Sequence, residues 1–236
     1  MGSRGRCWST RTRARPAPRA GQYVSVRVRM ADGVHQLRQY SLSCDPGGEL
    51  RRITVRRVAG TVGAPDGEVF ALLHDQVREG DELVLSAPFG AVFLDDSADA
   101  AAPVVLVSAG IGGTPMVGVL ARLAALGSPR PVLVLHADRS PAAHALRAET
   151  RELVAQLPDA RAVFWYEGCC PEEADAREGL LSLDGIELPE GATVFLCGPL
   201  PFMRGVRAEL LRAGVPARRI RYEVFGPDLW LPGTAD

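Results

Sequence analysis

A glycine-rich turn is the part of the sequence best suited to binding a ligand. Residues Val107–Pro115 read Val-Ser-Ala-Gly-Ile-Gly-Gly-Thr-Pro, between an apolar run and a helical pattern. Glycines let the backbone approach a pyrophosphate closely, and the start of a helix offers it free N–H groups and a positive dipole end. A proline in the first helical turn is compatible with that role. Alone, the pattern also fits a plain tight connection between a strand and a helix.

A second glycine turn and an acidic motif follow further along the chain. Thr193–Met203 reads Thr-Val-Phe-Leu-Cys-Gly-Pro-Leu-Pro-Phe-Met, so an apolar run again ends in a glycine and a helical pattern begins. In an open parallel sheet, ligands bind beyond the carboxyl ends of the strands where the strand order reverses, and two such turns would face each other there. Arg221–Pro227 places Glu223 and Phe225 at a strand end. By itself, this last motif also fits core packing and a cap.

The composition excludes several kinds of chemistry. All 27 basic side chains are arginines, because no lysine occurs in the 236 residues. Without lysine there is no Walker A phosphate lysine, no Schiff-base lysine and no kinase strand lysine. Five cysteines without C-x-x-C spacing predict neither a disulfide framework nor a metal site, and they fit a reducing compartment. The cysteines are Cys7, Cys44, Cys169, Cys170 and Cys197.

Charge and hydropathy argue against nucleic acid and membrane partners. Six arginines and no acid occupy residues 1–20, whereas 21 arginines face 28 acidic residues in the rest of the chain. The body therefore lacks the basic footprint of a nucleic-acid-binding protein. No apolar run reaches the ~18 residues of a membrane span, and residues 1–20 lack the apolar centre of a secretory signal. We expect a cytoplasmic protein, although the Arg-rich start also resembles an organelle transit peptide.

The first part of the chain predicts antiparallel strands. Residues 1–20 show no periodicity and are expected to be disordered or wrongly assigned coding sequence. From Gly21 to Leu94, alternating runs separated by Gly, Asp and Pro predict the strands of a barrel, with a helical insert at 69–77. The runs cover 22–29, 39–43, 52–58 and 82–86.

After an acidic, alanine-rich linker at 95–102, apolar runs alternate with helical patterns. This alternation predicts a five-stranded parallel sheet covered by helices on both faces. The runs cover 104–107, 132–135, 162–165 and 193–196, and the helical patterns cover 116–125, 144–157 and 201–213. We therefore predict a two-domain β plus α/β fold, with an antiparallel barrel over 21–99 and a Rossmann-like parallel-sheet domain over 100–236.

Nine motifs occur here in the order found in a known family. The chain resembles the ferredoxin-reductase superfamily of two-domain flavin reductases, and most closely the reductase half of bacterial flavohemoproteins, the nitric oxide dioxygenases. The matching motifs are Gly21–Val24, Arg38–Ser41, Leu73–Asp75, Glu79–Asp81, Ala87–Gly90, Gly110–Pro115, His136–Ala137, Cys197–Pro199 and Glu223–Pro227. The resemblance implies that 21–99 is an FAD-binding barrel and that 100–236 binds NAD(P)H.

The resemblance implies flavin-binding roles around the Arg-x-Tyr-Ser motif. Arg38 would pair with the FAD pyrophosphate, for which a planar guanidinium suits two oxygens. Tyr40, with Gln39 beside it, would pack against the flavin, and Ser41 would place a hydroxyl near the ring nitrogen that receives hydride. Tyr23 would lie along the same cofactor. The residues alone also allow a solvated strand arginine and half-buried packing tyrosines.

The resemblance also implies a nicotinamide dinucleotide site in the second domain. The expected binding residues are Gly110, Ile111, Gly112, Gly113, Thr114, Pro115, Cys197, Gly198 and Pro199. Cys197 would form a small wall near the nicotinamide rather than act as a nucleophile. The turn at His136–Ser140 offers Asp138 for a ribose 2′-hydroxyl and Arg139 for a 2′-phosphate. The resemblance favours NADH, and Arg139 keeps NADPH open.

The C-terminal motif is expected at the flavin. The residues concerned are Glu223, Val224, Phe225, Gly226 and Pro227. Phe225 would cover the flavin face and move when nicotinamide stacks there. Glu223 would act as an electrostatic or proton-handling group, and a strand-end ion pair fits it as well. With Tyr40, Ser41 and Cys197, Glu223 completes the expected catalytic set.

The sequence departs from the family pattern at three places. Phe70 stands where the family has a serine at the start of the helix that caps the flavin pyrophosphate, which predicts weaker FAD retention. Nothing in residues 1–20 resembles the first two barrel strands, so we expect an incomplete barrel with exposed edges and a misassigned start. The globin domain of the family is missing, and the four histidines indicate no haem site.

The implied reaction is hydride transfer from NAD(P)H to FAD, followed by single-electron delivery to a haem-type acceptor. That acceptor would be an external protein or a formerly fused globin domain. A free-standing NAD(P)H-dependent flavin or haem-protein reductase is the alternative enzyme. A non-catalytic nucleotide-binding remnant, whose barrel no longer holds flavin, is the third hypothesis.

Overall fold

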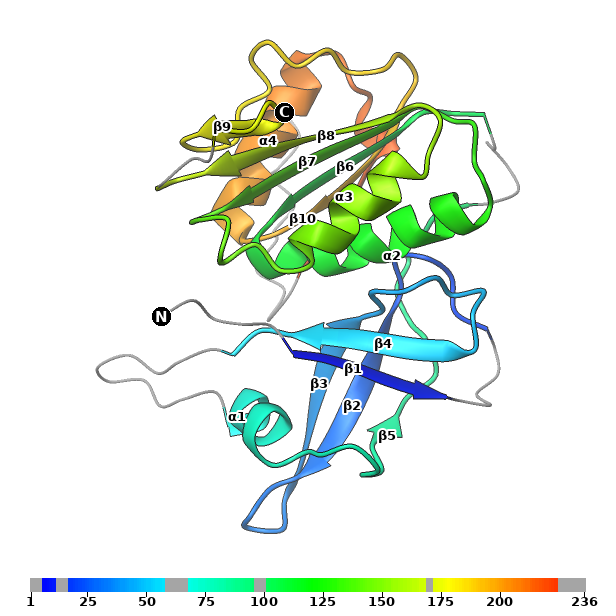
Figure 1. Cartoon of the computed structure of the whole chain (residues 1–236), viewed down its shortest axis with the longest axis vertical. Helices are drawn as coiled ribbons and strands as arrows, with labels where there is room; N and C mark the ends of the chain where they lie inside the picture. The colour runs from blue at the N-terminus through cyan, green and yellow to red at the C-terminus, as the bar shows by residue number, and fades with distance from the viewer. Residues whose placement is uncertain (1–5, 12–16, 58–67, 96–100, 169–171, 225–236) are drawn as a thin grey trace, which may run out of the picture.

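The computed structural model describes residues 6–11, 17–57, 68–95, 101–168 and 172–224. Antiparallel strands make up one half of the molecule, and a parallel sheet with helices makes up the other (Figure 1). The predicted β plus α/β fold is therefore confirmed. The first half contains β1 (Arg6–Arg11), β2 (Tyr23–Arg29), β3 (His35–Ser41), β4 (Leu50–Val55), α1 (Glu68–Asp75) and β5 (Val84–Leu85).

Strand β2 is the centre of the antiparallel half. Val24, Val26 and Val28 are buried, whereas Arg27 and Arg29 between and after them are exposed, as a strand with one face on a core requires. The strand pairs antiparallel with both β3 and β5. Its buried valines join apolar side chains of β4 and α1 in one cluster. This core fixes the orientation of β3, which carries the Arg-x-Tyr-Ser motif.

The N-terminal strand is the main departure from the predicted first half. Arg6–Arg11 lies in the segment expected to be disordered, yet it forms β1 and pairs antiparallel with β4 along its whole length. The expectation of disorder is therefore wrong for these six residues. Local composition does not reveal such a strand, because strand preference depends on the neighbouring strand that it pairs with.

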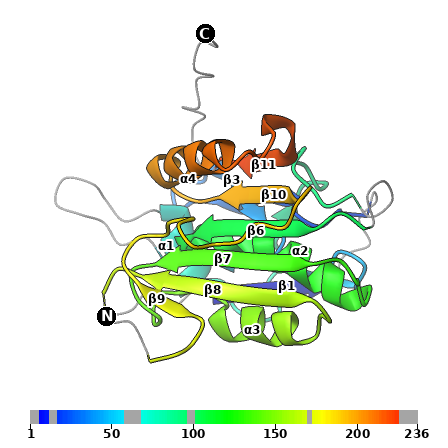
Figure 2. The same cartoon turned by 90° about the horizontal axis from the view of Figure 1, so that it is seen from above.

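The second half is built on a six-stranded parallel sheet. Its strands are β6 (Val104–Ala109), β7 (Val132–Asp138), β8 (Ala160–Tyr166), β9 (Ala176–Glu178), β10 (Thr193–Cys197) and β11 (Ile220–Glu223). The spatial order is β11-β10-β6-β7-β8-β9, so the order reverses between β6 and β10 (Figure 2). The prediction of five strands missed β9, because three residues of the sequence Ala-Arg-Glu form no apolar run.

Helices cover both faces of this sheet. Helices α2 (Gly113–Ala125) and α3 (Arg147–Ala155) pack on one face, and α4 (Leu200–Arg212) packs on the other. Short 3-10 turns, η1 (Gly110–Gly112) and η2 (Ala217–Arg219), precede α2 and β11. Helix α3 is shorter than predicted, because Leu146 has a left-handed φ of 60° and so cannot continue a right-handed helix. His144 therefore lies in the turn before α3.

The two halves pack directly against each other through α2 (Figure 1). A Cβ added at Gly118 of α2 would lie 2.4 Å from the carbonyl oxygen of Leu42, which follows β3. An ion pair between Arg52 on β4 and Glu149 on α3, with an N–O distance of 2.5 Å, links the same surfaces. The C-terminal end of β3 is thus held against α2, and β4 is held against α3.

Within the described ranges, no helix is both long enough and apolar enough to cross a membrane. Those residues also contain no group of three or more His, Cys, Asp or Glu side chains placed to hold a metal ion.

Candidate functional site

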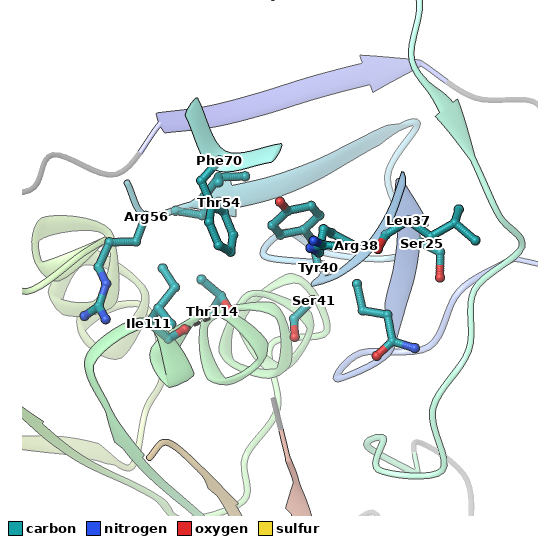
Figure 3. Close-up of a pocket in the computed structure, with 12 residues that line it drawn as sticks. Ser25, Leu37, Arg38, Tyr40, Ser41, Thr54, Arg56, Phe70, Ile111 and Thr114 are labelled. Atoms are coloured by element: carbon teal, nitrogen blue, oxygen red, sulfur yellow. Dashed lines mark hydrogen bonds between the residues drawn. The ribbon is translucent and has the colours of Figure 1, made fainter. Parts of the chain in front are cut away.

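A cavity of about 550 Å³ lies between the two halves (Figure 3). Its lining residues are Ser25, Leu37, Arg38, Gln39, Tyr40, Ser41, Thr54, Val55, Arg56, Phe70, Ile111 and Thr114. Most of them come from the antiparallel strands and α1, and the last two come from the glycine turn of the other half. The structure therefore brings the Arg-x-Tyr-Ser motif and the glycine turn together at one cavity.

Two hydroxyls beside this cavity have no protein partner. The Tyr40 hydroxyl and the Ser41 Oγ are both buried, and neither hydrogen-bonds to any described residue. Burial raises the pKa of Tyr40 to about 12, against the opposing effect of the nearby Arg38 guanidinium, so the phenol keeps its proton. Buried polar groups are normally hydrogen-bonded, so these two indicate a polar ligand that completes them. The cavity therefore fits a large, partly polar group.

An aromatic side chain from α1 closes one wall of the cavity. The ring of Phe70 meets that of Tyr40 edge to face, with 6.3 Å between the centroids. Figure 3 shows both rings above the start of α2, where Ile111 and Thr114 lie. Phe70 thus supplies an apolar contact at this wall, and the weaker FAD retention expected from its place in the sequence stays a prediction.

Of the other residues predicted to bind flavin, Arg38 and Gln39 line the cavity and Tyr23 does not. Arg38 is exposed at the cavity and donates hydrogen bonds to the Leu37 carbonyl oxygen and the Gln36 Oε1, each at 2.8 Å. Gln39 also lines the cavity. Tyr23 does not, because its ring lies against Phe89, with the two centroids 6.4 Å apart.

The glycine turn adopts a geometry that strongly favours glycine. Gly110 has a left-handed φ of 54°. A Cβ added at Gly112 would lie 2.5 Å from the Cys197 carbonyl oxygen at the end of β10. Helix α2 begins at Gly113, two residues earlier than Pro115, and no side chain caps its N-terminus. The Gly113 N–H donates to the carbonyl oxygens of Gly110 and Ile111, so the N–H groups that face the switch point between β6 and β10 without an intrahelical partner are those of η1.

Cys197 and Glu223 lie side by side at this switch point. They face each other in the register of β10 and β11. Burial, reinforced by the charge of Glu223, raises the pKa of the Cys197 thiol, and burial also raises the pKa of Glu223. A fully buried Cys197 thiol that keeps its proton fits the expected role of a small, unreactive side chain beside the nicotinamide. Val224 is half-buried beside them, whereas Phe225, Gly226 and Pro227 lie outside the described residues.

Two buried histidines, His136 and His144, lie next to the predicted ribose-binding turn. His136 on β7 hydrogen-bonds through Nδ1 to Ser108 Oγ at 2.8 Å and stacks on His144, with the centroids 3.9 Å apart. Asp138 is buried, and its Oδ1 accepts from the Arg139 backbone N–H at 2.8 Å. The Arg139 side chain is exposed. The exposed Arg139 side chain lies where it would meet a 2′-phosphate, whereas Asp138 already accepts one backbone hydrogen bond.

Several cavity residues escaped the sequence reasoning. Leu37, Thr54 and Arg56 line the cavity without belonging to a motif. Thr54 Oγ1 shares a hydrogen bond of 2.8 Å with Ser43 Oγ. The alternation of β4 indicated which side chains face inward, but only the packing of the two halves shows that Arg56 reaches the glycine turn.

Comparison with known proteins identifies the family. A family model described as "Oxidoreductase NAD-binding domain" matches residues 106–208. The flavohemoprotein of Chromobacterium violaceum is 45% identical over 223 residues, which are 90% of this chain and 54% of that protein. The flavohem-like FAD/NAD-binding domain of Vibrio cholerae nitric oxide dioxygenase superposes with a TM-score of 0.85 at 35% identity, covering 96% of this chain and 95% of that one. The chain belongs to this family of reductase domains.

Flavohemoprotein-type reductase domains are FAD- and NAD(P)H-dependent oxidoreductases, and the resemblance predicted from the motifs is confirmed. The flavohemoglobin of Malassezia yamatoensis, solved with bound FAD and haem, has a TM-score of 0.82 at 32% identity, covering 95% of this chain and 57% of that one. The chain thus spans about half the length of the flavohemoproteins that it matches.

Proposed function

We propose that the chain transfers a hydride from NAD(P)H to FAD and passes the electrons to a haem-type acceptor, as the reductase part of a nitric oxide dioxygenase. The cavity between the two halves carries this proposal. It joins two buried hydroxyls of the Arg-x-Tyr-Ser motif to a glycine turn at a helix start. FAD, when bound, supplies the conversion between hydride transfer and single-electron transfer.

The residues of the first half would bind and orient the flavin. Arg38, exposed in the middle of β3, would offer a planar guanidinium to phosphate oxygens. Tyr40 presents a ring and a protonated hydroxyl, and Ser41 presents a hydroxyl without a protein partner. Both hydroxyls would gain the hydrogen bonds that they lack, which favours the loaded state.

The residues of the second half would bring the nicotinamide to that cavity. The N–H groups of η1, which begins the helical segment that continues into α2, would hold the dinucleotide phosphates. Ile111 and Thr114 line the cavity, so a dinucleotide on this turn extends toward the flavin side. Glu223, whose pKa burial raises, would hold or release a proton beside Cys197. The main contribution of the protein is then orientation and exclusion of water.

A flavin absorbance spectrum of the purified full chain, with Arg38→Ala and Ser41→Ala beside it, tests this proposal. The unchanged chain is expected to bind FAD, and both variants are expected to lose flavin occupancy. Equal occupancy in all three proteins would contradict the flavin site. A colourless chain that still binds nucleotide would support the non-catalytic remnant instead.

The acceptor is tested separately. The flavin-loaded chain, reduced with NADH, is mixed with a globin haem protein, and reduction of the haem is followed by absorbance. Rapid haem reduction supports the proposed acceptor class. Reduction of free flavin with no haem reduction would favour a free-standing flavin reductase.

A further inference from the structure

A buried histidine beside the glycine turn has no role in the function described above. His136 lies on β7, and its ring contacts the residues at both ends of the turn. Before the turn, Ser108 Oγ shares a hydrogen bond of 2.8 Å with His136 Nδ1. After the turn, a Cβ added at Gly113 would lie 3.3 Å from His136 Cε1 and 3.4 Å from Nδ1. One imidazole ring therefore spans the point where the turn begins and the point where it ends.

The parallel sheet places this ring directly beside the turn. Ser108 and His136 face each other in the register of β6 and β7, which are neighbours in the sheet under α2 (Figure 2). On the other side of the turn, a Cβ added at Gly112 would lie 2.5 Å from the Cys197 carbonyl oxygen of β10. The turn is thus confined by backbone on one side and by the imidazole of His136 on the other.

A second histidine keeps the His136 ring in place. His144 stacks on it with 3.9 Å between the centroids and 21° between the planes, and His144 Nδ1 hydrogen-bonds to the Tyr166 hydroxyl at 3.0 Å. Burial, together with His136 and the charges of Arg147 and Arg151, lowers the pKa of His144 to about 2. The stacked partner is therefore a neutral ring that is itself fixed by a hydrogen bond.

The Asp138 carboxylate faces the far edge of the same ring. The side chains of Asp138 and His136 are each 3% exposed, and Asp138 Oδ2 lies 3.8 Å from His136 Nε2. Neither of these two atoms has a hydrogen-bond partner among the described residues. A carboxylate beside a ring nitrogen favours the proton on that nitrogen, which leaves Nδ1 to accept from the Ser108 hydroxyl. The carboxylate predicted for a ribose thus faces the imidazole.

We propose that His136 is a positioning residue for the nicotinamide dinucleotide. With its proton on Nε2 and a hydrogen bond from Ser108 to Nδ1, the ring holds the two ends of the glycine turn, so that the N–H groups of η1 meet the phosphates without reordering. A turn that is already ordered avoids an entropic cost on binding. The inference rests on the proposed function and deepens it, because it names what keeps the turn in its binding conformation. His136 acts through the turn and does not itself touch the dinucleotide.

Calorimetric titration of the FAD-loaded full chain with ADP-ribose tests the proposal, because ADP-ribose carries the pyrophosphate without the reactive ring. Ser108→Ala is expected to raise the Kd for ADP-ribose by about three- to tenfold, through loss of one buried hydrogen bond. His136→Leu, which also removes the ring, is expected to raise it by more than about tenfold. His136→Asn is expected to recover part of the affinity, since its amide oxygen can accept from the Ser108 hydroxyl.

Thr150→Val is the matched control. Thr150 is a second buried hydroxyl residue beside the same two histidines, but its Oγ1 donates to the Leu146 carbonyl oxygen at the start of α3 and not to the turn. This variant is expected to lose stability, as Ser108→Ala does, and to keep the wild-type Kd for ADP-ribose. The flavin content of all four variants is expected to stay at the wild-type value, because the predicted flavin residues around Tyr40 lie in the other half.

Nitrogen NMR of the histidine-labelled full chain adds a readout that a merely structural role would not change. The chain has four histidines, so single replacements assign each signal. His136 is expected to be neutral with its proton on Nε2, and its ring signals are expected to shift when ADP-ribose is added. The signals of His35, which is exposed on β3, are expected to stay unchanged.

Three outcomes would overturn the role of His136 and leave the proposed function standing. The first is a wild-type Kd for ADP-ribose in both Ser108→Ala and His136→Leu. The second is an equal rise of the Kd in Thr150→Val, which would attribute the effect to general destabilisation. The third is a His136 proton on Nδ1, or ring signals that ignore ADP-ribose. Failure of the unchanged chain to bind ADP-ribose would instead contradict the proposed function, and the role of His136 with it.

Discussion

Single residues show where the protein gives up stability for binding. Tyr40 and Ser41 bury hydroxyls without partners, at a cost of about 1–3 kcal/mol for each group. Two positions further on, Ser43 is equally buried but shares a hydrogen bond with Thr54. A buried serine that has no protein partner and lies at a cavity is better explained by a ligand than by folding.

Ser41→Ala and Ser43→Ala are therefore expected to behave oppositely. Ser41→Ala is expected to leave the flavin-free protein as stable as before, or more stable, and to weaken FAD binding by about three- to tenfold. Ser43→Ala is expected to lower the free energy of unfolding by about 1–2 kcal/mol, because it removes the buried hydrogen bonds that Ser43 Oγ makes with Thr54 Oγ1 and Arg52 Nε. Urea unfolding and FAD titration measure the two effects. A loss of stability in Ser41→Ala would argue against a ligand-directed hydroxyl.

His144 makes the stability of the second half dependent on pH. Its burial, then His136 and the arginines Arg147 and Arg151, lower the pKa of His144 to about 2. The unfolded chain takes up a proton near its usual pKa of ~6.5, whereas the folded chain does not. The stabilisation is therefore complete above about pH 6.5 and is lost as pH falls toward the folded value.

The free energy of unfolding is expected to rise with pH between about 4.5 and 6 by up to ~1.4 kcal/mol per pH unit from this group. His144→Gln is expected to flatten that slope. His35→Gln, at an exposed position on β3, is the control that keeps it. Urea unfolding at several pH values measures the slopes, and equal slopes in His144→Gln and the unchanged chain would contradict the assignment.

At the scale of elements, the sequence predicted most strands and helices because their burial is periodic. The alternation along β2 and the apolar runs of β6 and β7 reflect cores on one face and on two faces. Elements fixed by non-local contacts were missed. Strand β1 depends on pairing with β4, β9 on the edge of β8, and the start of α3 on the left-handed Leu146.

The contact between η1 and β10 is the most constrained junction of elements. Gly112→Ala is expected to destabilise the protein by about 1–3 kcal/mol and to weaken ADP-ribose binding, because its Cβ would lie 2.5 Å from the Cys197 carbonyl oxygen. Gly205→Ala, in the exposed middle of α4 with nothing within 4 Å, is expected to stabilise by about 0.5–1 kcal/mol. Thermal unfolding measures both. Equal stability of the two variants would contradict the packing at η1.

At the scale of the whole molecule, the site exists only because the two halves meet. The motifs on β3 and at η1 were predicted from their residue types, each within its own half. Three features depend on how α2 packs against the antiparallel strands. They are the shared cavity, the approach of Arg56 to Gly110 and the ion pair between Arg52 and Glu149. No local pattern contains that information, so the sequence predicted the components of the site but not their junction.

Anaerobic titration of the FAD-loaded full chain with NADH tests the central claim most directly, because it asks whether the two predicted sites act on each other. The account predicts that the flavin absorbance near its visible maximum bleaches fully at one equivalent of NADH per flavin. A chain that binds both FAD and NADH yet leaves the flavin absorbance unchanged would contradict hydride transfer across this cavity.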